Sequence, residues 1–332
     1  MTHRHDILAI GNAIVDLIAV ADDDFLLRHK VHKGAMTLID EARAEKIYAA
    51  MGPVTMASGG SAANTVVGAA ALGAKTAFIG KVRDDELGRG FTHDIRAMGA
   101  HFTTAPAVEG PGTARCFVLV TPDGQRTMNT YLGACQALGV ADVDESAVKG
   151  ASLVYLEGYL WDPPEAKKAF RKAADIAHAA GRRVALTLSD SFCVDRYRDE
   201  FLQLIRSKTV DIVFANESEL HALYQTADFE TAVNLMREDA TLAAVTRSEK
   251  GVLILTREES HAIPAFPVDR IVDTTGAGDL FAAGFLAGLA KDAPLAHCAR
   301  LGAMAAAEII QHIGARPETN LAAMAAENGL AL

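Results

Sequence analysis

The sequence lacks several features that would place it in a simple class. Its four cysteines, Cys116, Cys135, Cys193 and Cys298, show no C-x-x-C spacing, so neither disulfides nor a cysteine-ligated metal is expected. The longest apolar stretch, 280–290, has eleven residues and is too short to span a membrane. The first residues carry no secretory signal. We therefore expect a cytoplasmic protein with reduced thiols.

The chain also lacks the short motifs of several large enzyme classes. It has no G-x-x-x-x-G-K-[ST], no G-x-G-x-x-G, no H-E-x-x-H and no G-x-S-x-G. These absences exclude a P-loop, a dinucleotide fingerprint, a zincin-type metal site and a hydrolase nucleophile elbow. Basic residues are scarce, because 32 Lys and Arg stand against 42 Asp and Glu, a formal charge of −10. This balance argues against a nucleic-acid partner, and nothing points to a membrane.

What the chain does have is a regular succession of apolar and amphipathic segments. Half of its 332 residues are hydrophobic and 22% are charged, which is typical of a globular protein with a large core. Short apolar runs at 153–156, 184–188, 212–214 and 242–246 predict buried strands, with helical segments between them. Alternating strands and helices predict an α/β fold with a mainly parallel central sheet covered by helices on both faces.

Two segments interrupt this alternation. They lie at about 17–40 and 103–131, and the second contains a hairpin pattern with Pro122-Asp123-Gly124 as its turn. We expect the two segments to form a small β-sheet lid on the α/β core. No repeat or Pro/Ser-rich linker divides the chain, so we expect a single domain over residues 1–332.

The strongest chemical signal is D-T-T-G-A-G-D at 273–279, directly before an apolar helix. Small residues at a helix start leave backbone N–H groups exposed where the helix dipole is positive, which makes an anion site from Gly276, Ala277 and Gly278. Asp279 would stand beside that anion and is a candidate base. The alternative is a capped helix start whose glycines only allow close packing.

Two further patterns indicate a ligand site. Gly59 and Gly60 precede an Ala-rich helix that contains Asn64, so a ligand could approach the backbone there, although Gly-Gly is often only a turn. Asn12 and Asp16 follow the first predicted strand, at the edge where open α/β sheets bind ligands. A carboxylate such as Asp16 suits the adjacent hydroxyls of a sugar, and the alternative is a surface residue that ends a strand.

Asn216 and Glu219 follow the predicted strand at 212–214. One interpretation is an N-cap followed by acidic residues in the first helical turn. The other is an outer anchor for hydrated Mg²⁺, an ion that keeps several of its waters.

Taken together, these motifs resemble a known family. G-G-S-A-A-N at 59–64 and D-T-T-G-A-G-D at 273–279 are similar to the two signatures of the ribokinase-like (PfkB) kinases, and N-x-x-E at 216–219 is similar to their metal-associated motif. The resemblance covers nearly the whole chain and is closest to the adenosine kinases. It implies a three-layer α/β/α core with a β lid, and ATP-dependent phosphorylation of a hydroxyl.

The resemblance also implies roles for individual residues. By this comparison Asp279 is the base and the backbone of 276–278 is the anion hole. The residues that would hold the sugar or the transferred phosphate are Asn12, Asp16, Gly59, Gly60, Asn64 and Arg126. Those that would contact ATP and Mg²⁺ are Asn216, Glu219, Thr246, Gly251, Thr275, Gly276 and Gly278. Asp273, Thr275 and the 314–315 region resemble a monovalent-cation loop, which makes K⁺ a candidate activator.

The implied reaction is phosphorylation of the 5′-hydroxyl of a purine nucleoside, with adenosine converted to AMP as the first expectation. A kinase of a free sugar (ribose, fructose or 2-keto-3-deoxygluconate) is the alternative, and a catalytically silent binding protein is a third. An apolar slot near Met36, Leu38 and Tyr159 would favour a purine, whereas a sugar acid would require an arginine there. Pairing of two copies through the lid is a further expectation. Ser248, where the family often has glycine, and Asp190 have no assigned role.

Overall fold

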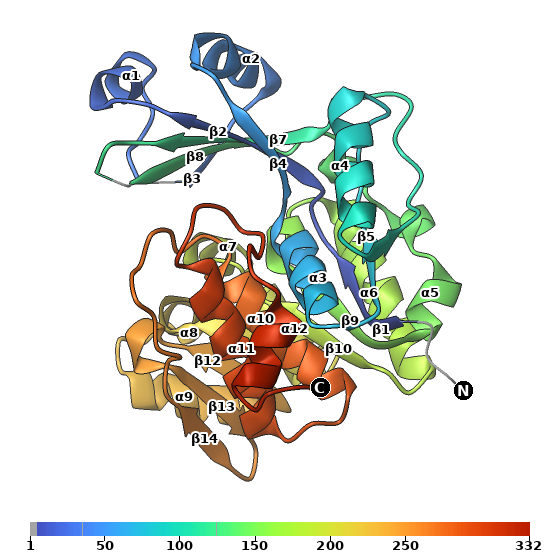
Figure 1. Cartoon of the computed structure of the whole chain (residues 1–332). Coiled ribbons are helices and arrows are strands. Elements are labelled where there is room, and N and C mark those ends of the chain that lie inside the picture. The colour runs from blue at the N-terminus through green and yellow to red at the C-terminus, as the bar shows by residue number, and fades with distance from the viewer. Residues whose placement is uncertain (1–4, 35, 124) are drawn as a thin grey trace.

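The computed structural model describes residues 5–34, 36–123 and 125–332, and its centre is a nine-stranded sheet (Figure 1). The strand order is β14-β13-β12-β11-β10-β9-β1-β5-β6, parallel except for the antiparallel pairs β12/β13 and β13/β14. The bounds are β1 His5–Ile10, β5 Thr76–Ile79, β6 Ala100–Phe102, β9 Ala151–Glu157, β10 Arg183–Thr187, β11 Ile212–Asn216, β12 Leu242–Thr246, β13 Val252–Thr256 and β14 Ser260–Ile263.

Helices cover both faces of this sheet, and each face has its own apolar core. One face packs against α3 Ser61–Ala71, α4 Glu86–Ala97, α10 Ala277–Ala290, α11 Leu295–Ile309 and α12 Leu321–Glu327. The other packs against α5 Glu145–Lys149, α6 Pro164–Ala179, α7 Ser191–Arg206, α8 Glu217–Tyr224 and α9 Phe229–Asp239. Short 3₁₀ turns lie at Gly133–Ala137, Val140–Asp142, Gly158–Trp161 and Ser248–Lys250. The predicted three-layer α/β/α core is confirmed.

The central strands are continuous apolar runs because they are buried on both faces. Every residue of β1 is buried, and its register with β9 pairs Ile7 with Leu153 and Ile10 with Leu156. Helix α10 is equally apolar and lies between α3 and α11. A side chain at Gly68 would meet Leu280, so the small residues of α3 are what allow α10 to pack so closely.

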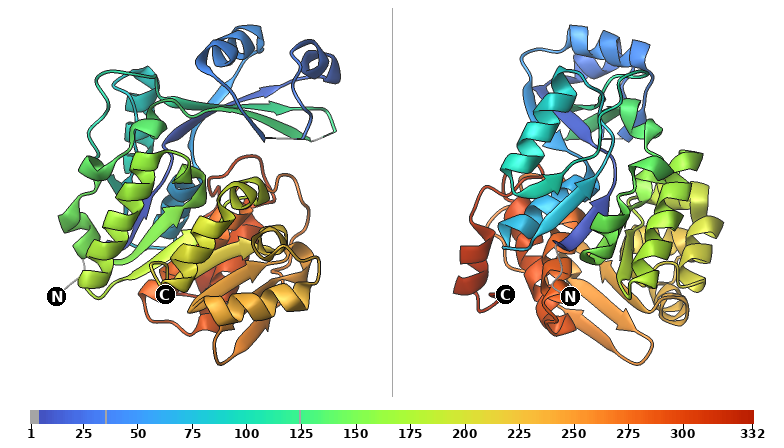
Figure 2. Two further views of the ribbon diagram at one scale, coloured as in Figure 1. Left: turned by 180° about the vertical axis from the view of Figure 1, so that it is seen from behind. Right: turned by 90° about the vertical axis from the view of Figure 1, so that its right-hand side faces the viewer.

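A second, five-stranded sheet stands off one end of the core, with α1 Asp23–Arg28 and α2 Glu41–Ala50 on its outer side (Figures 1 and 2). Its order is β3 Met36–Leu38, β8 Arg126–Tyr131, β7 Ala114–Val120, β2 Ile14–Val20 and β4 Thr55–Gly59. We call it the small sheet.

The small sheet takes in more of the chain than the two segments predicted for the lid. It begins at Ile14 and includes β4, whereas 103–113 is a connection without a strand of this sheet. The sequence of β4, T-M-A-S-G, has a single β-branched residue, so its composition does not indicate a strand. The predicted hairpin is present as β7 and β8, although Gly124 of its turn lies outside the described residues.

The two faces of the small sheet differ in their surroundings. Val15, Leu17 and Phe117 point toward the α2 side and are buried in the core cluster that also contains Ile47. The alternate residues of β2, including Asp16, are half-buried on the opposite face, toward the core. The four cysteines are buried and unpaired, as expected. Within the described ranges, no helix is both long and apolar enough to cross a bilayer.

Candidate functional site

The predicted site residues gather where the parallel strands end. Asn12 follows β1, Asn216 ends β11 and Thr246 ends β12, and Glu157, which was not predicted, ends β9. Since these strands are parallel neighbours in one sheet, their carboxyl ends share an edge, and the small sheet stands above that edge (Figure 1). This is the position at which open α/β sheets bind ligands.

Asp279 lies in the first turn of α10 and is held by two donors from the first turn of α3. Ser61 Oγ donates to Asp279 Oδ1 at 2.6 Å, and Asn64 Nδ2 donates to Oδ2 at 2.9 Å. Burial raises the pKa of Asp279, whereas these two hydrogen bonds and the positive charge of Arg316 lower it. The two hydrogen bonds thus fix the orientation of the carboxylate. A group that accepts the proton of one particular hydroxyl must be oriented in this way.

The position of Asn64 differs from the one expected. Its amide nitrogen is used on Asp279, and its Oδ1 is buried without a hydrogen-bond partner. The residue therefore orients the candidate base, and only its oxygen is left for a ligand hydroxyl.

The anion hole expected at 276–278 has fewer free donors than predicted. The Ala277 N–H bonds to the Thr274 carbonyl at 3.2 Å, which uses it in a turn. Among the residues that the structure describes, the Gly276 and Gly278 amides make no backbone hydrogen bond. Gly276 has φ +80°, where glycine is favoured, and a side chain at Gly278 would meet nothing within 4 Å. The space beside Gly278 is open for an anion.

Both predicted glycines of the second cluster lie against the predicted sugar-binding residues. A Cβ at Gly59 would collide with the carboxylate of Asp16, and one at Gly60, where φ is +97°, would collide with the Asn12 carbonyl. Burial raises the pKa of Asp16 to about 6, although Arg316 and Arg126 oppose that rise. The structure thus brings Asn12, Asp16, Gly59 and Gly60 together.

Glu157 is a site residue that the sequence interpretation missed. It is buried, with 1% of its surface exposed, and accepts hydrogen bonds from Asn12 N (3.2 Å), Asn12 Nδ2 (2.7 Å) and Ala62 N (2.9 Å). Burial raises its pKa to about 7. One signal was available, because a carboxylate directly after the apolar run 153–156 lies at the ligand-binding edge.

Arg316 was also missed. It follows α11 in a loop and donates from Nε to the Ser58 carbonyl (3.0 Å) and from Nη1 to the Ala63 carbonyl (2.9 Å). Burial lowers the pKa of Arg316 to about 10, and the charges of Asp16 and Asp279 oppose this. No local pattern indicated it, because it reaches the site from a distant segment.

Arg126 connects the small sheet to the loop before α10. Its Nη1 forms an ion pair with Asp273 Oδ2 and donates a hydrogen bond to Thr275 Oγ1, both at 2.9 Å. Asp273 also accepts the backbone N–H groups of Thr275 (3.0 Å) and Gly314 (2.9 Å). Both oxygens of Asp273, the residue that resembles a cation ligand, are therefore engaged.

Asn216 and Glu219 adopt the capping arrangement. Asn216 Oδ1 accepts from Glu219 N at 2.8 Å, while Glu219 accepts from Asn216 N (3.0 Å) and Nδ2 (2.6 Å). Burial raises the pKa of Glu219 to about 7, and the charge of Asp190 adds to that rise. Within residues 5–34, 36–123 and 125–332 no group of three metal-ligating side chains exists. The motif therefore does not fit directly bound Mg²⁺. Glu219 could contact the ion only through a water molecule.

Thr246 and Gly251 flank the turn between β12 and β13. Ser248, which replaces a glycine of the family pattern, has φ +51°, so the backbone keeps the left-handed conformation that the glycine would favour. Gly251 has φ +86°, and a Cβ there would collide with the Ile263 carbonyl. Asp190 caps α7 by accepting from Cys193 N at 2.6 Å.

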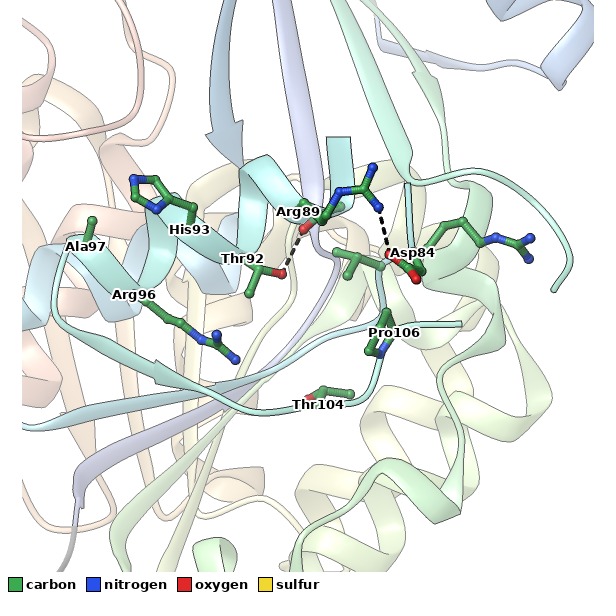
Figure 3. Close-up of a pocket in the computed structure, with 11 residues that line it drawn as sticks. Asp84, Arg89, Thr92, His93, Arg96, Ala97, Thr104 and Pro106 are labelled. Atoms are coloured by element: carbon green, nitrogen blue, oxygen red, sulfur yellow. Dashed lines mark hydrogen bonds and ion pairs between the residues drawn. The ribbon is translucent and has the colours of Figure 1, made fainter. Parts of the chain in front are cut away.

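A hollow of about 540 Å³ lies between α4 and the connection after β6 (Figure 3). Arg83, Arg89, His93 and Arg96 line it, and Arg89 pairs with Asp84 at 2.8 Å. It contains none of the residues grouped around Asp279.

The family model described as pfkB family carbohydrate kinase matches residues 4–321. The chain belongs to this family. Membership implies ATP as co-substrate, usually with Mg²⁺.

Solved structures of two bacterial relatives match the whole fold of this pfkB kinase. The adenosine kinase from Sinorhizobium meliloti is 55% identical with a TM-score of 0.93, covering 98% of this chain and 99% of that one. A probable sugar kinase from Rhizobium etli CFN 42 is 53% identical with a TM-score of 0.95, covering 99% and 100%. The adenosine kinase of Saccharomyces cerevisiae is 27% identical over 331 residues, 93% of this chain and 95% of that protein.

Proposed function

We propose that this kinase transfers the γ-phosphoryl group of ATP to the 5′-hydroxyl of a purine nucleoside, adenosine first among them. The observation that carries the proposal is Asp279, fixed by Ser61 and Asn64 beside the open space at Gly278. A protein that only binds its ligand needs no oriented base next to an anion site. The similarity to the adenosine kinase of S. meliloti supports adenosine as the acceptor.

The face of the small sheet toward the core supports a nucleoside. Asp16 of β2 pairs with Cys116 of β7, and Val118 and Met128 follow on the same face, so apolar side chains lie beside a carboxylate that also feels the charges of Arg316 and Arg126. Asp16 can accept from vicinal ribose hydroxyls while the apolar side chains contact a base. Arg126 of β8 lies at this face and is paired through Nη1 with Asp273, while its Nη2 is buried without a hydrogen-bond partner among the described residues.

The predicted slot residues come from two separate elements. Met36 and Leu38 are on β3, where they pair with Met128 and Thr130 of β8, so they share the core-facing side. Tyr159 comes from the turn after β9, and the pKa of its phenol is raised by burial and by the charge of Asp190.

The chemistry assigned to the site is a single displacement. The acceptor oxygen forms a bond to the γ-phosphorus, the bond from that phosphorus to the β–γ bridging oxygen breaks, and the proton of the hydroxyl moves to Asp279. The Gly276 and Gly278 amides face the transferred group and stabilise its charge, and such positioning dominates phosphoryl transfer. Mg²⁺ enters as part of the MgATP substrate and neutralises phosphate charge.

A substrate panel tests the proposal. ADP formation is measured with adenosine, inosine, guanosine, ribose, fructose and 2-keto-3-deoxygluconate at equal concentration. We expect adenosine to give the highest kcat/KM, because its base fits the apolar face and its ribose fits Asp16. Turnover of a free sugar without any nucleoside would establish the sugar-kinase alternative that the R. etli relative suggests. Binding without turnover would indicate the silent binding protein.

The role of Ser61 gives a prediction for the pH profile. Its hydrogen bond lowers the pKa of Asp279, so Ser61→Ala raises that pKa further and leaves the base protonated at higher pH. We expect the acid limb of kcat/KM to move up by about one pH unit. Thr65→Ser serves as the control, because its hydroxyl bonds to the Ser61 carbonyl and not to Asp279. An unmoved acid limb in Ser61→Ala would contradict the assignment of Asp279 as base.

Three expectations stay predictions: activation by K⁺, pairing of two copies through the small sheet, and a cytoplasmic location. For K⁺, the engaged oxygens of Asp273 mean that a cation would have to use backbone carbonyls of the same loop. Comparing initial rates in K⁺ and in tetramethylammonium buffers tests it.

A further inference from the structure

Arg316 is half-buried as a residue, but its guanidinium is enclosed and makes no ion pair within the described part of the chain. Its two hydrogen bonds go to the carbonyls of Ser58 and Ala63, which are uncharged. Among the described residues, no carboxylate lies within salt-bridge distance of its guanidinium. Burial of a cation without a counter-ion is unfavourable, so its retention beside the site requires an explanation.

The guanidinium also has an unused donor. Arg316 Nη2 is buried and has no hydrogen-bond partner, although Nε and Nη1 of the same group are both used. Buried donors are nearly always satisfied by protein, water or a ligand, so this nitrogen leaves a place for a partner. The two carbonyl bonds fix the plane of the guanidinium, and therefore the direction of the unused nitrogen.

The charges around Arg316 come from both sides of the proposed acceptor site. Asp16 of the small sheet and Asp279 of α10 both respond to its charge, and each carboxylate raises the pKa of Arg316 in turn. The other charged groups involved are Arg126, which acts on Asp16, and Asp94 of α4, which acts on Arg316. The charge of Asp279 also raises the pKa of Asp16, so the two carboxylates repel each other.

We propose that Arg316 is a substrate-contacting residue whose free Nη2 donates to an oxygen of the acceptor held between Asp16 and Asp279. The inference rests on the proposed function only in requiring a hydroxylated acceptor at this place. The competing explanation is a tether that joins the loop after α11 to the start of α3 through the two carbonyl bonds.

Two substitutions separate the donor from the charge. Arg316→Lys keeps the charge and loses the planar donor, whereas Arg316→Gln loses the charge. For the acceptor we expect KM to rise roughly 10- to 100-fold in both variants, as for loss of a charge-assisted hydrogen bond, with KM for ATP unchanged. The acid limb of kcat/KM should stay in place in Arg316→Lys and move up by about one pH unit in Arg316→Gln. Arg96→Met is the matched control, because Arg96 also donates to a backbone carbonyl, that of Phe102, away from the site.

A tether would lower thermal stability in both variants without moving the acid limb or separating the two KM values, and that result would overturn the inference.

A second measurement needs no substrate and so also serves a variant of low activity. In protein labelled with ¹³C at the aspartate carboxyls, the pKa of Asp16, about 6 in the parent, should rise in Arg316→Gln. An unchanged Asp16 titration would also overturn it. If the panel shows turnover of a sugar and none of adenosine, the proposed substrate fails, and the same Arg316 comparison is made with that sugar.

Discussion

Replacing Asp279 with asparagine is expected to lower kcat by about 10²- to 10⁴-fold while both KM values stay within a few fold. The amide is nearly the same shape as the carboxylate but cannot accept the proton of the attacking hydroxyl. Its oxygen can still accept from Asn64, and its nitrogen can donate to Ser61 Oγ, so the local hydrogen bonds survive with one reversal. The loss should therefore appear in turnover, measured by steady-state kinetics with MgATP and adenosine.

The matched control is Asp6→Asn. Asp6 is a buried carboxylate at the start of β1, at the opposite end of the strand from the site, where it accepts from Lys75 N and pairs with Lys291. This variant should lose stability and keep its kcat. Turnover of Asp279→Asn within a few fold of the parent would remove Asp279 from the role of base and leave the Gly276 and Gly278 amides as the main catalytic groups.

Most of the fold could be predicted because its elements carry strong one-dimensional signals. The runs at 153–156, 184–188, 212–214 and 242–246 mark parallel strands, although Leu188 lies one residue past β10, since a strand buried on both faces must be apolar throughout. β4 could not be predicted in the same way. It is an edge strand of the small sheet, and its identity depends on pairing with β2, which local composition does not encode.

The site could be predicted only in part, for a related reason. Motifs place a residue at a strand end or a helix start, and the structure has Asn12 after β1 and Asp279 in the first turn of α10, whereas Asp16, expected at the end of the first strand, lies inside β2 of the small sheet. They do not say which distant side chain completes each hydrogen bond. Asn64 therefore contacts Asp279 where a sugar contact was expected, and Arg316 enters from a loop with no pattern of its own.

Glu157→Gln is expected to remove a large part of the pH dependence of stability. The pKa of Glu157 is about 7 in the folded protein against an ordinary value of 4.5, because the carboxylate is buried. The folded state therefore binds this proton more tightly than the unfolded state, and between pH 4.5 and 7 stability falls as pH rises. A difference of about 2.5 in pKa corresponds to about 3 kcal/mol in the free energy of unfolding. Glutamine does not titrate, so the variant should gain about this much relative to the parent between pH 4.5 and 8.

Denaturant unfolding at a series of pH values measures this difference, with the exposed Glu165→Gln as a control that should follow the parent. The gain depends on the amide fitting the same three donors. Its oxygen can accept from Asn12 N and Ala62 N, but its nitrogen then faces Asn12 Nδ2, so the Asn12 amide must turn over. That turn would present a different atom to the acceptor, and we expect kcat/KM to fall although stability at pH 8 rises. A parallel pH dependence in variant and parent would show instead that Glu157 is ionised without cost, with its three donors replacing water completely.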